Sequence, residues 1–204
     1  FDDAGREYLD FVSGIGVVNL GHSHPAVVEA VREQIGKLTH VSNLYYVEHR
    51  SELAEDLATL AGGDMKVFFC NSGAEASEGA IKLARKWATF NKPAGARTVV
   101  SALKSFHGRT FFTVTVGGQA SYSDGFGPKP GAVLHAEFNN LDSVKALISD
   151  KTCAIVVEPI QGEGGIIPAT AEFLQGLRQL CDQHNALLVM DEVQTGVGRT
   201  GKLY

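Results

Sequence analysis

Two kinds of apolar pattern alternate along the chain from residue 66 onward. Short runs rich in valine, isoleucine and leucine predict strands over residues 66–70, 98–103, 133–136, 153–158 and 187–191. Between them, apolar side chains at helical spacing predict helices over about 73–91 and 140–149, and one that begins at Thr170. Because strands such as 153–158 are apolar on both faces, we expect an α/β fold with a mostly parallel sheet and flanking helices.

The residues before this region have a different pattern. Residues 6–12 alternate polar and apolar side chains, which predicts an exposed strand. Pro25 stands where a helix places its first residue, and apolar side chains at helical spacing continue to about residue 38. A further helix is predicted over about 47–61, with the glycines at 62–63 as its stop.

The predicted elements divide the chain into two parts. Residues 1–62 form an N-terminal segment of strand and helices, and residues 63–204 form part of a larger domain that contains the sheet. In the helix over 47–61, we expect three leucines to face inward, namely Leu53, Leu57 and Leu60. The segment 110–116 stays open, since it alternates like a strand and yet follows a loop that could open a helix.

Composition and charge exclude several classes of protein. The chain carries 18 basic and 23 acidic residues without a basic stripe, so we expect no nucleic-acid partner. No apolar run approaches the roughly 18 residues of a membrane span. The three cysteines are too scattered for a disulfide framework or a metal site, and we expect reduced thiols in the cytoplasm. The missing initial methionine and the end shortly after a glycine-rich loop are typical of a fragment.

Polar residues follow three of the predicted strands, where ligands collect in open α/β sheets. The strand ends carry Glu158, Asp191 and the group Asn71, Ser72 and Gly73. Free amides at the start of a helix favour an anion such as phosphate, and Gly73 lets the backbone approach it closely. The same group could equally be an ordinary N-cap. Asp191 could hold a protonated ring nitrogen, or it could simply cap a loop.

Two further segments carry candidate chemistry. Phe106 could stack on a flat cofactor and Arg109 could bind a carboxylate through two N–H groups. A core phenylalanine and a surface arginine would look the same in the sequence. Glu158 and Glu163 could form a hydrolase pair, but no histidine or aspartate stands at a useful spacing for a metal site.

A glycine-rich loop near the end of the chain imitates a nucleotide-binding motif. Residues 196–201 satisfy G-x-G-x-x-G, and Lys202 follows them. The loop does not directly follow a strand, and Leu203 stands where a P-loop has a hydroxyl residue. A nucleotide-binding module is therefore kept only as the alternative from another class of protein.

A phosphate cradle, a stacking aromatic ring and an acidic partner for a ring nitrogen are what pyridoxal phosphate (PLP) requires. Four ordered motifs resemble those of the class III aminotransferases of PLP fold type I, at residues 71–76, 106–110, 158–165 and 191–201. Further segments resemble the bacterial N-acetylornithine and succinylornithine aminotransferases, at residues 42–45, 116–119, 122–128 and 173–178. The resemblance covers nearly the whole chain.

The resemblance implies a role for each candidate residue near the cofactor. Ser72, Gly73 and Ala74 would bind the phosphate. Phe106 would stack on one face of the ring, and Val193 would pack on the other. Asp191 would pair with the pyridine nitrogen and Gln194 with the ring hydroxyl. Glu158 would help to order that side, and His107 would lie beside the ring in a role that the sequence leaves open.

The resemblance also implies a set of substrate-binding residues. Arg109 would bind the α-carboxylate of the substrate, and Glu163 would meet an arginine further along the family's sequence. Ile15 and Tyr46 would complete the substrate side. Ornithine enzymes tend to have a tyrosine where Ile15 stands, and an aliphatic side chain cannot hydrogen-bond a free α-amino group. This argues for a substrate whose α-amino group is acylated or absent.

The activity implied for the complete protein is a transamination. The terminal amino group of N-acetylornithine or succinylornithine would pass to 2-oxoglutarate, in a cytoplasmic homodimer of arginine and ornithine metabolism. The family's Schiff-base lysine would lie beyond Tyr204, so we expect no catalytic residue in this chain and no activity from it alone. Ornithine and 4-aminobutyrate aminotransferases remain alternatives, as does a non-catalytic PLP-binding fragment.

Overall fold

The computed structural model describes all 204 residues, and the contacts within it divide the chain into two compact units. The first unit contains residues 1–69 and 194–204, and the second contains residues 70–193. The division into residues 1–62 and 63–204 stays a prediction. None of the helices combines the length and the apolar character needed to cross a membrane.

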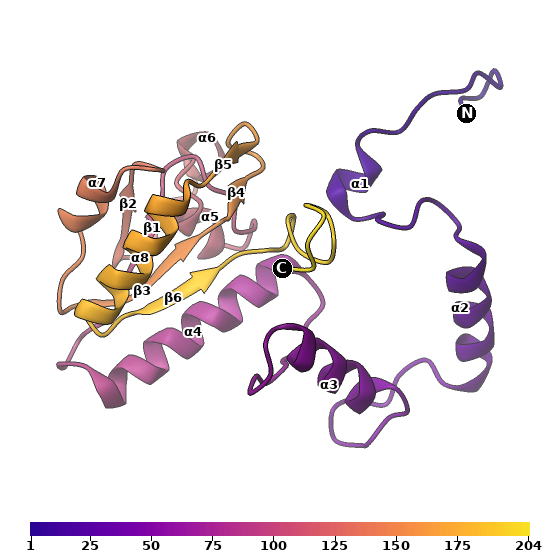
Figure 1. The fold of residues 1–204 in the computed structure, drawn as a ribbon, viewed down its shortest axis with the longest axis horizontal. Helices are drawn as coiled ribbons and strands as arrows, with labels where there is room; N and C mark the ends of the chain where they lie inside the picture. The colour runs from indigo at the N-terminus through magenta and orange to yellow at the C-terminus, as the bar shows by residue number, and fades with distance from the viewer. The chain divides into compact units, whose positions relative to one another are not determined.

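A parallel four-stranded sheet forms the centre of the second unit (Figure 1). Its strands, in chain order, are β1 (Thr98–Ala102), β2 (Val133–Ala136), β3 (Thr152–Val157) and β6 (Leu187–Met190). They lie in the order β2-β1-β3-β6, and every neighbouring pair is parallel. The prediction of a mostly parallel α/β sheet is confirmed, and each of these strands lies within one residue of its predicted bounds.

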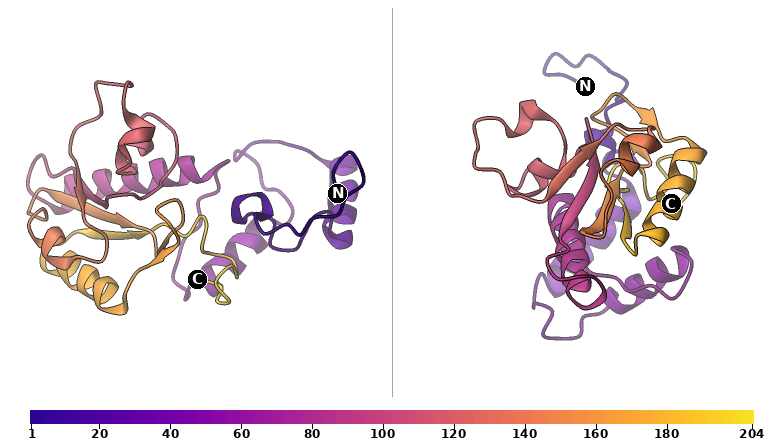
Figure 2. Two further views of the ribbon diagram at one scale, coloured as in Figure 1. Left: turned by 90° about the horizontal axis from the view of Figure 1, so that it is seen from above. Right: turned by 90° about the vertical axis from the view of Figure 1, so that its left-hand side faces the viewer.

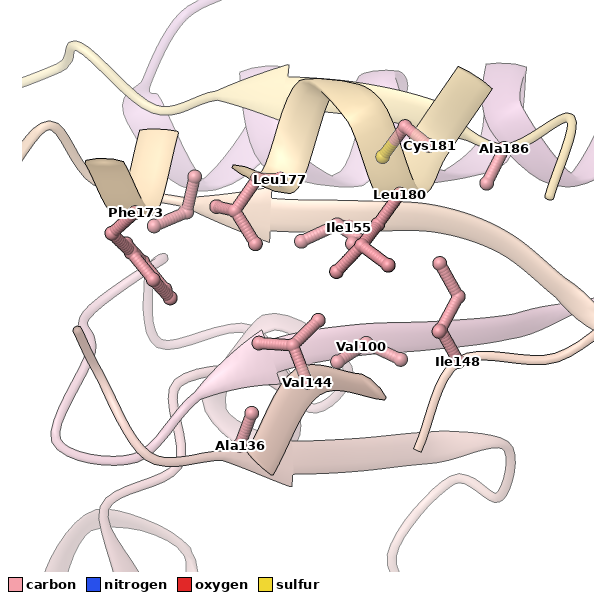
Figure 3. Packing of buried hydrophobic residues seen from close by; sticks show 11 residues of the cluster. Val100, Ala136, Val144, Ile148, Ile155, Phe173, Leu177, Leu180, Cys181 and Ala186 are labelled. Atoms are coloured by element: carbon pink, nitrogen blue, oxygen red, sulfur yellow. The ribbon is translucent and has the colours of Figure 1, made fainter. Parts of the chain in front are cut away.

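Alternate residues of each strand point to opposite faces of the sheet. Because apolar side chains lie on both faces, helices cover both of them. Helix α4 (Gly73–Asn91) lies on one side of the sheet and α8 (Ala171–Gln183) on the other (Figure 2). Val99 and Val156 pack in the cluster under α4, whereas Val100, Ile155 and Val157 pack in the cluster under α8. Figure 3 shows Phe173, Leu177 and Leu180 of α8 pointing onto the second of these clusters.

The short elements of the second unit show which structure residues 110–116 adopt, and they correct one predicted helix. Residues 110–116 contain the helix α5 (Thr113–Val116), with Thr110 Oγ1 accepting from the amide of Thr113. Helix α7 (Leu141–Lys145) is shorter than the predicted 140–149, because the chain turns directly after it. Sequence reasoning missed α6 (Ala120–Ser123) and a small antiparallel pair, β4 (Ile160–Gln161) with β5 (Ile167–Pro168).

The first unit contains three helices and no strand. They are α1 (Ser13–Gly16), α2 (Pro25–Lys37) and α3 (Arg50–Leu60). Helices α2 and α3 were predicted, with Pro25 at the start of α2. The strands predicted over 6–12 and 66–70 are wrong, since neither segment finds a partner to share its backbone hydrogen bonds.

The leucines of α3 also differ from the prediction. Leu53 and Leu60 are 50% and 57% exposed rather than inward-facing, and Leu57 is half-buried. Neither α2 nor α3 contains a buried residue. Helical spacing shows which side chains share a face, but burial of that face needs a neighbour that packs against it.

Candidate functional site

Two hydrogen bonds join the segments that follow β1, β3 and β6 at one edge of the sheet. The amide of Phe106, after β1, donates to Glu158 Oε2, after β3, over 3.1 Å. The ring of His107 lies next to Asp191, after β6, with 2.7 Å between Nδ1 and Oδ2. Strand ends far apart in the sequence therefore form one polar cluster, as the parallel sheet predicts.

Asp191 is held from two sides. Because an ionised carboxylate only accepts hydrogen bonds, His107 donates from Nδ1 to Oδ2. The amide of Val193 donates to Oδ1 over 3.0 Å. The side chain of Asp191 is 9% exposed, so the carboxylate is oriented and largely shielded from water. Each oxygen keeps a lone pair for a further donor.

His107 has one nitrogen in use and one unused. Its side chain is fully buried, and Nε2 has no hydrogen-bond partner. The sequence left its role open, and the structure pairs it with Asp191.

Glu158 links two loops beneath the same edge. It is 5% exposed and accepts from the amides of Phe106 and Gly162, at 3.1 and 3.4 Å. Burial raises the pKa of its carboxyl group, and the positive potential of His107 and the two amide bonds oppose that rise. Glu158 thus fixes the position of Phe106 relative to β3.

The start of α4 combines an N-cap with two free amides. Ser72 Oγ accepts a hydrogen bond from the amide of Glu75 over 3.2 Å, so Ser72 is the N-cap of this helix. The amides of Gly73 and Ala74 donate to no acceptor within the chain. The cap and the anion site are therefore compatible, since they use different N–H groups.

Two glycines allow close packing around this helix start. A Cβ on Gly73 would lie 2.9 Å from Val193 Cγ1, so Val193 packs directly on the first turn of α4. A Cβ on Gly108 would lie 2.7 Å from the Cβ of Ala74. The need for Gly108 was missed, although its place inside the motif at 106–110 was a signal. Val193, Ala74 and the loop after β1 thus converge on one point.

Arg109 lies among aromatic rings. Its Cζ is 4.5 Å from the ring centroid of Tyr122 and 5.7 Å from that of Phe106. Phe106 and Tyr122 meet edge to face, with 6.0 Å between centroids. Arg109 makes no hydrogen bond or salt bridge. Sequence reasoning missed Tyr122 as a site residue, although it opens the segment 122–128 noted for its resemblance.

Glu163 stands exposed in the turn between β4 and β5. Gln161 holds this hairpin to the segment after β1, donating from Nε2 to the carbonyl of Leu103 over 2.9 Å. Gly164 is required there, because a Cβ would lie 2.8 Å from both Gln161 Oε1 and the carbonyl of Lys104. The hairpin therefore carries Glu163 at the same edge of the sheet as Phe106.

Three predicted site residues belong to the first unit. Within it, a Cβ on Gly16 would lie 3.9 Å from the carbonyl of Gln194, so the turn that carries Ile15 approaches Gln194. Arg199 Nη2 donates to the carbonyl of Gly16 over 2.9 Å and holds the two segments together. Tyr46 is 98% exposed and packs against neither residue.

The residues of the second unit fit pyridoxal phosphate. The free amides of Gly73 and Ala74 suit the phosphate, and Asp191 has spare lone pairs for a protonated ring nitrogen. The ring of Phe106, which Glu158 helps to position, offers a flat apolar face. An anionic, aromatic and protonated heterocycle is the kind of ligand that this set of groups can hold.

The chain belongs to the aminotransferase class-III family, whose sequence profile matches residues 1–204. It is 56% identical over 204 residues to an acetylornithine aminotransferase from Vibrio vulnificus (strain YJ016), covering all of this chain and 50% of the relative. It is 55% identical over the same length to a succinylornithine transaminase from Salmonella paratyphi A, again covering 50% of it.

A solved structure agrees with this family. The ornithine aminotransferase from Toxoplasma gondii, in which PLP partly occupies the active site, superposes with a TM-score of 0.93 at 33% identity. The match covers 100% of this chain and 49% of that one. The fold is that of PLP fold type I, and PLP is the cofactor of the family. The chain spans about half the length of the curated relatives it matches.

Proposed function

We propose that the full-length protein transfers the terminal amino group of N-acetylornithine or succinylornithine to 2-oxoglutarate. The names of the two relatives at 56% and 55% identity support this substrate class. The observation that carries the proposal is the carboxylate of Asp191, which His107 and the amide of Val193 orient, while the side chain of Val193 packs on Gly73 at the start of α4.

Asp191 would accept a hydrogen bond from the pyridine nitrogen of PLP and keep that nitrogen protonated. The donors from His107 and from the Val193 amide hold the carboxylate in one orientation before the cofactor arrives. When bound, PLP supplies an electron sink for the carbon that carries the amino group. The role of Asp191 is to maintain the charge on which that sink depends.

Other residues of the chain would position the cofactor. Ser72, Gly73 and Ala74 would hold the phosphate at the start of α4. Phe106 would cover one face of the ring, and Val193 the other, because Val193 already packs on Gly73. Gln194 would reach the ring hydroxyl.

The substrate would be recognised at its carboxylate and its acyl group. Arg109 would bind the α-carboxylate through two N–H groups, which are free in this structure. Ile15 would present an apolar surface that cannot hydrogen-bond a free α-amino group. Tyr46 would line the same side, and Glu163 would pair with an arginine outside this chain.

The test is a comparison of amino donors with the full-length protein and 2-oxoglutarate. We expect kcat/KM for N-acetylornithine and succinylornithine to exceed that for ornithine and 4-aminobutyrate at least about 10-fold. Faster transfer from ornithine or 4-aminobutyrate would replace the proposed substrate class. No transfer from any of the four amines would overturn the proposal.

We further propose that this chain alone catalyses no transamination. The lysines within the chain, among them Lys82, Lys104 and Lys202, lie outside the family's lysine motif. Borohydride reduction in the presence of PLP should leave the intact mass of the chain without a specific adduct. A single adduct on one of these lysines would contradict this assignment.

We also propose that the full-length protein is a cytoplasmic homodimer. Light scattering of the full-length protein tests whether it is a dimer.

A further inference from the structure

We propose that Tyr122 is a positioning residue that holds the guanidinium of Arg109 in place for the carboxylate of the substrate. The inference rests on the proposed function in one respect, namely that Arg109 binds this carboxylate. It starts from a contact between Arg109 and Tyr122 that the sequence motifs and the resemblance to the family did not predict. The Cζ atom of Arg109 lies 4.5 Å from the centroid of the Tyr122 ring.

This contact leaves the donors of Arg109 available. A guanidinium over an aromatic ring is attracted through its flat face, whereas its five N–H donors lie in its plane. Arg109 makes no hydrogen bond or salt bridge in this structure. An acidic residue in the place of Tyr122 would pair with the same N–H groups that a substrate carboxylate needs. Tyr122 can hold Arg109 without competing with that ligand.

The Tyr122 ring is itself fixed to the loop that carries Arg109. The Tyr122 and Phe106 rings meet edge to face at an interplanar angle of 90°, with 6.0 Å between centroids. Gln119, just before α6, donates from Nε2 to the carbonyl of Ser105 over 3.2 Å. The amide of Tyr122 donates to the carbonyl of Gln119 over 3.1 Å. Backbone and ring are thus both anchored beside Phe106.

A second anchor lies at the other end of α6. Ser123 is buried, and its Oγ donates to the carbonyl of Gln119 over 3.4 Å. Lys129 Nζ donates to the same Oγ over 2.8 Å. The short helix is therefore tied down on both sides of Tyr122. A well-held side chain is what positioning of a long, flexible arginine requires, because it lowers the entropy that Arg109 loses on binding.

The experiment measures the donor half-reaction of the full-length protein by single-turnover absorbance, without 2-oxoglutarate. Two donors are compared: N-acetylornithine, and 4-acetamidobutylamine, which is the same molecule without its carboxylate. For Tyr122→Ala, we expect the apparent Kd of N-acetylornithine to rise about 10-fold and that of the amine to stay unchanged. The limiting rate at saturating N-acetylornithine should change less than about 3-fold, because Tyr122 touches no reacting atom.

Three further variants make the result specific. Tyr122→Phe keeps the ring and should bind N-acetylornithine like the unmodified protein. Phe126 lies in the same segment, and its ring is 62% exposed and does not contact Arg109. Phe126→Ala should therefore also leave the Kd of N-acetylornithine unchanged. Arg109→Lys, which keeps the charge and loses the two-point fork, should weaken N-acetylornithine alone.

The outcomes separate this inference from the proposed function. If Tyr122→Ala leaves both donors unchanged, or weakens both equally, while Arg109→Lys weakens only N-acetylornithine, the positioning role is wrong and the role of Arg109 stands. If Arg109→Lys also changes the Kd of both donors equally, or of neither, then Arg109 does not bind the carboxylate. The positioning role of Tyr122 is then wrong as well.

Discussion

Asp191 receives its two donors from different places in the chain. One is the amide of Val193, two residues away, and the other is the ring of His107, 84 residues away in the sequence. A carboxylate held in this way is prepared for the charge that it would stabilise.

At this residue, Asp191→Ala in the full-length protein should lower the rate of the donor half-reaction about 10²–10³-fold. The reason is that the protonated ring nitrogen would lose the carboxylate that we propose as its partner. Single-turnover absorbance measures the rate. Asp182→Ala, which removes a 67% exposed carboxylate on α8, is the matched control and should have no effect. A rate near that of the unmodified protein for Asp191→Ala would refute the role of Asp191.

Glu158 allows a prediction about pH. Burial raises the pKa of its carboxyl group, so the folded chain binds this proton more tightly than the unfolded chain does. Its contribution to stability is full below the unfolded pKa and is lost as the pH rises through the folded pKa. Relative to the unmodified chain, Glu158→Gln should therefore become more stable as the pH rises from about 4 to about 8.

Urea unfolding of both chains at several pH values measures this difference in the free energy of unfolding. Glu55→Gln, at an exposed position of α3, should show a difference that does not change with pH. A difference for Glu158→Gln that stays constant or reverses its sign would contradict the prediction.

At the scale of elements, α4 depends on what its first turn touches. Gly73→Ala places a Cβ 2.9 Å from Val193 Cγ1, so Val193 must move and the chain should lose about 1–3 kcal/mol of stability. The same change at Gly36, inside α2 with no atom within 4 Å, should instead stabilise by about 0.5–1 kcal/mol. Thermal unfolding of the two variants compares them. A Gly73→Ala variant as stable as Gly36→Ala would show that Val193 does not pack on α4.

The elements also show which patterns can be read from the sequence alone. The apolar run at 153–158 and the N-cap at Thr170 predict β3 and α8, because both signals are local. The run at 66–70 carries a similar signal and forms no strand. Strand formation requires a partner for the backbone donors and acceptors, and a sequence pattern does not state whether that partner is present.

For the whole molecule, buried side chains are concentrated in one of the two units. Every buried apolar residue lies between residues 70 and 193, whereas α2 and α3 contain none. In this chain, the amides of β1 and β3 should therefore exchange hydrogen at least about 100-fold more slowly than those of α2 and α3. Hydrogen exchange followed by mass spectrometry makes this comparison. Equal protection in both units would show that burial does not set their local stability.

The sequence by itself determined the local parts of this protein: the long helices α4 and α8, the strands β1, β2, β3 and β6, the polar residues that end those strands, and the motifs of the family. These depend on residues that are neighbours in the chain, so periodicity and capping are enough to reveal them. Only the tertiary structure decided the order β2-β1-β3-β6, the pairing of His107 with Asp191 and the contact of Tyr122 with Arg109. Each of these joins residues separated along the chain, and nothing in the local pattern of a strand or loop states which distant segment will lie beside it.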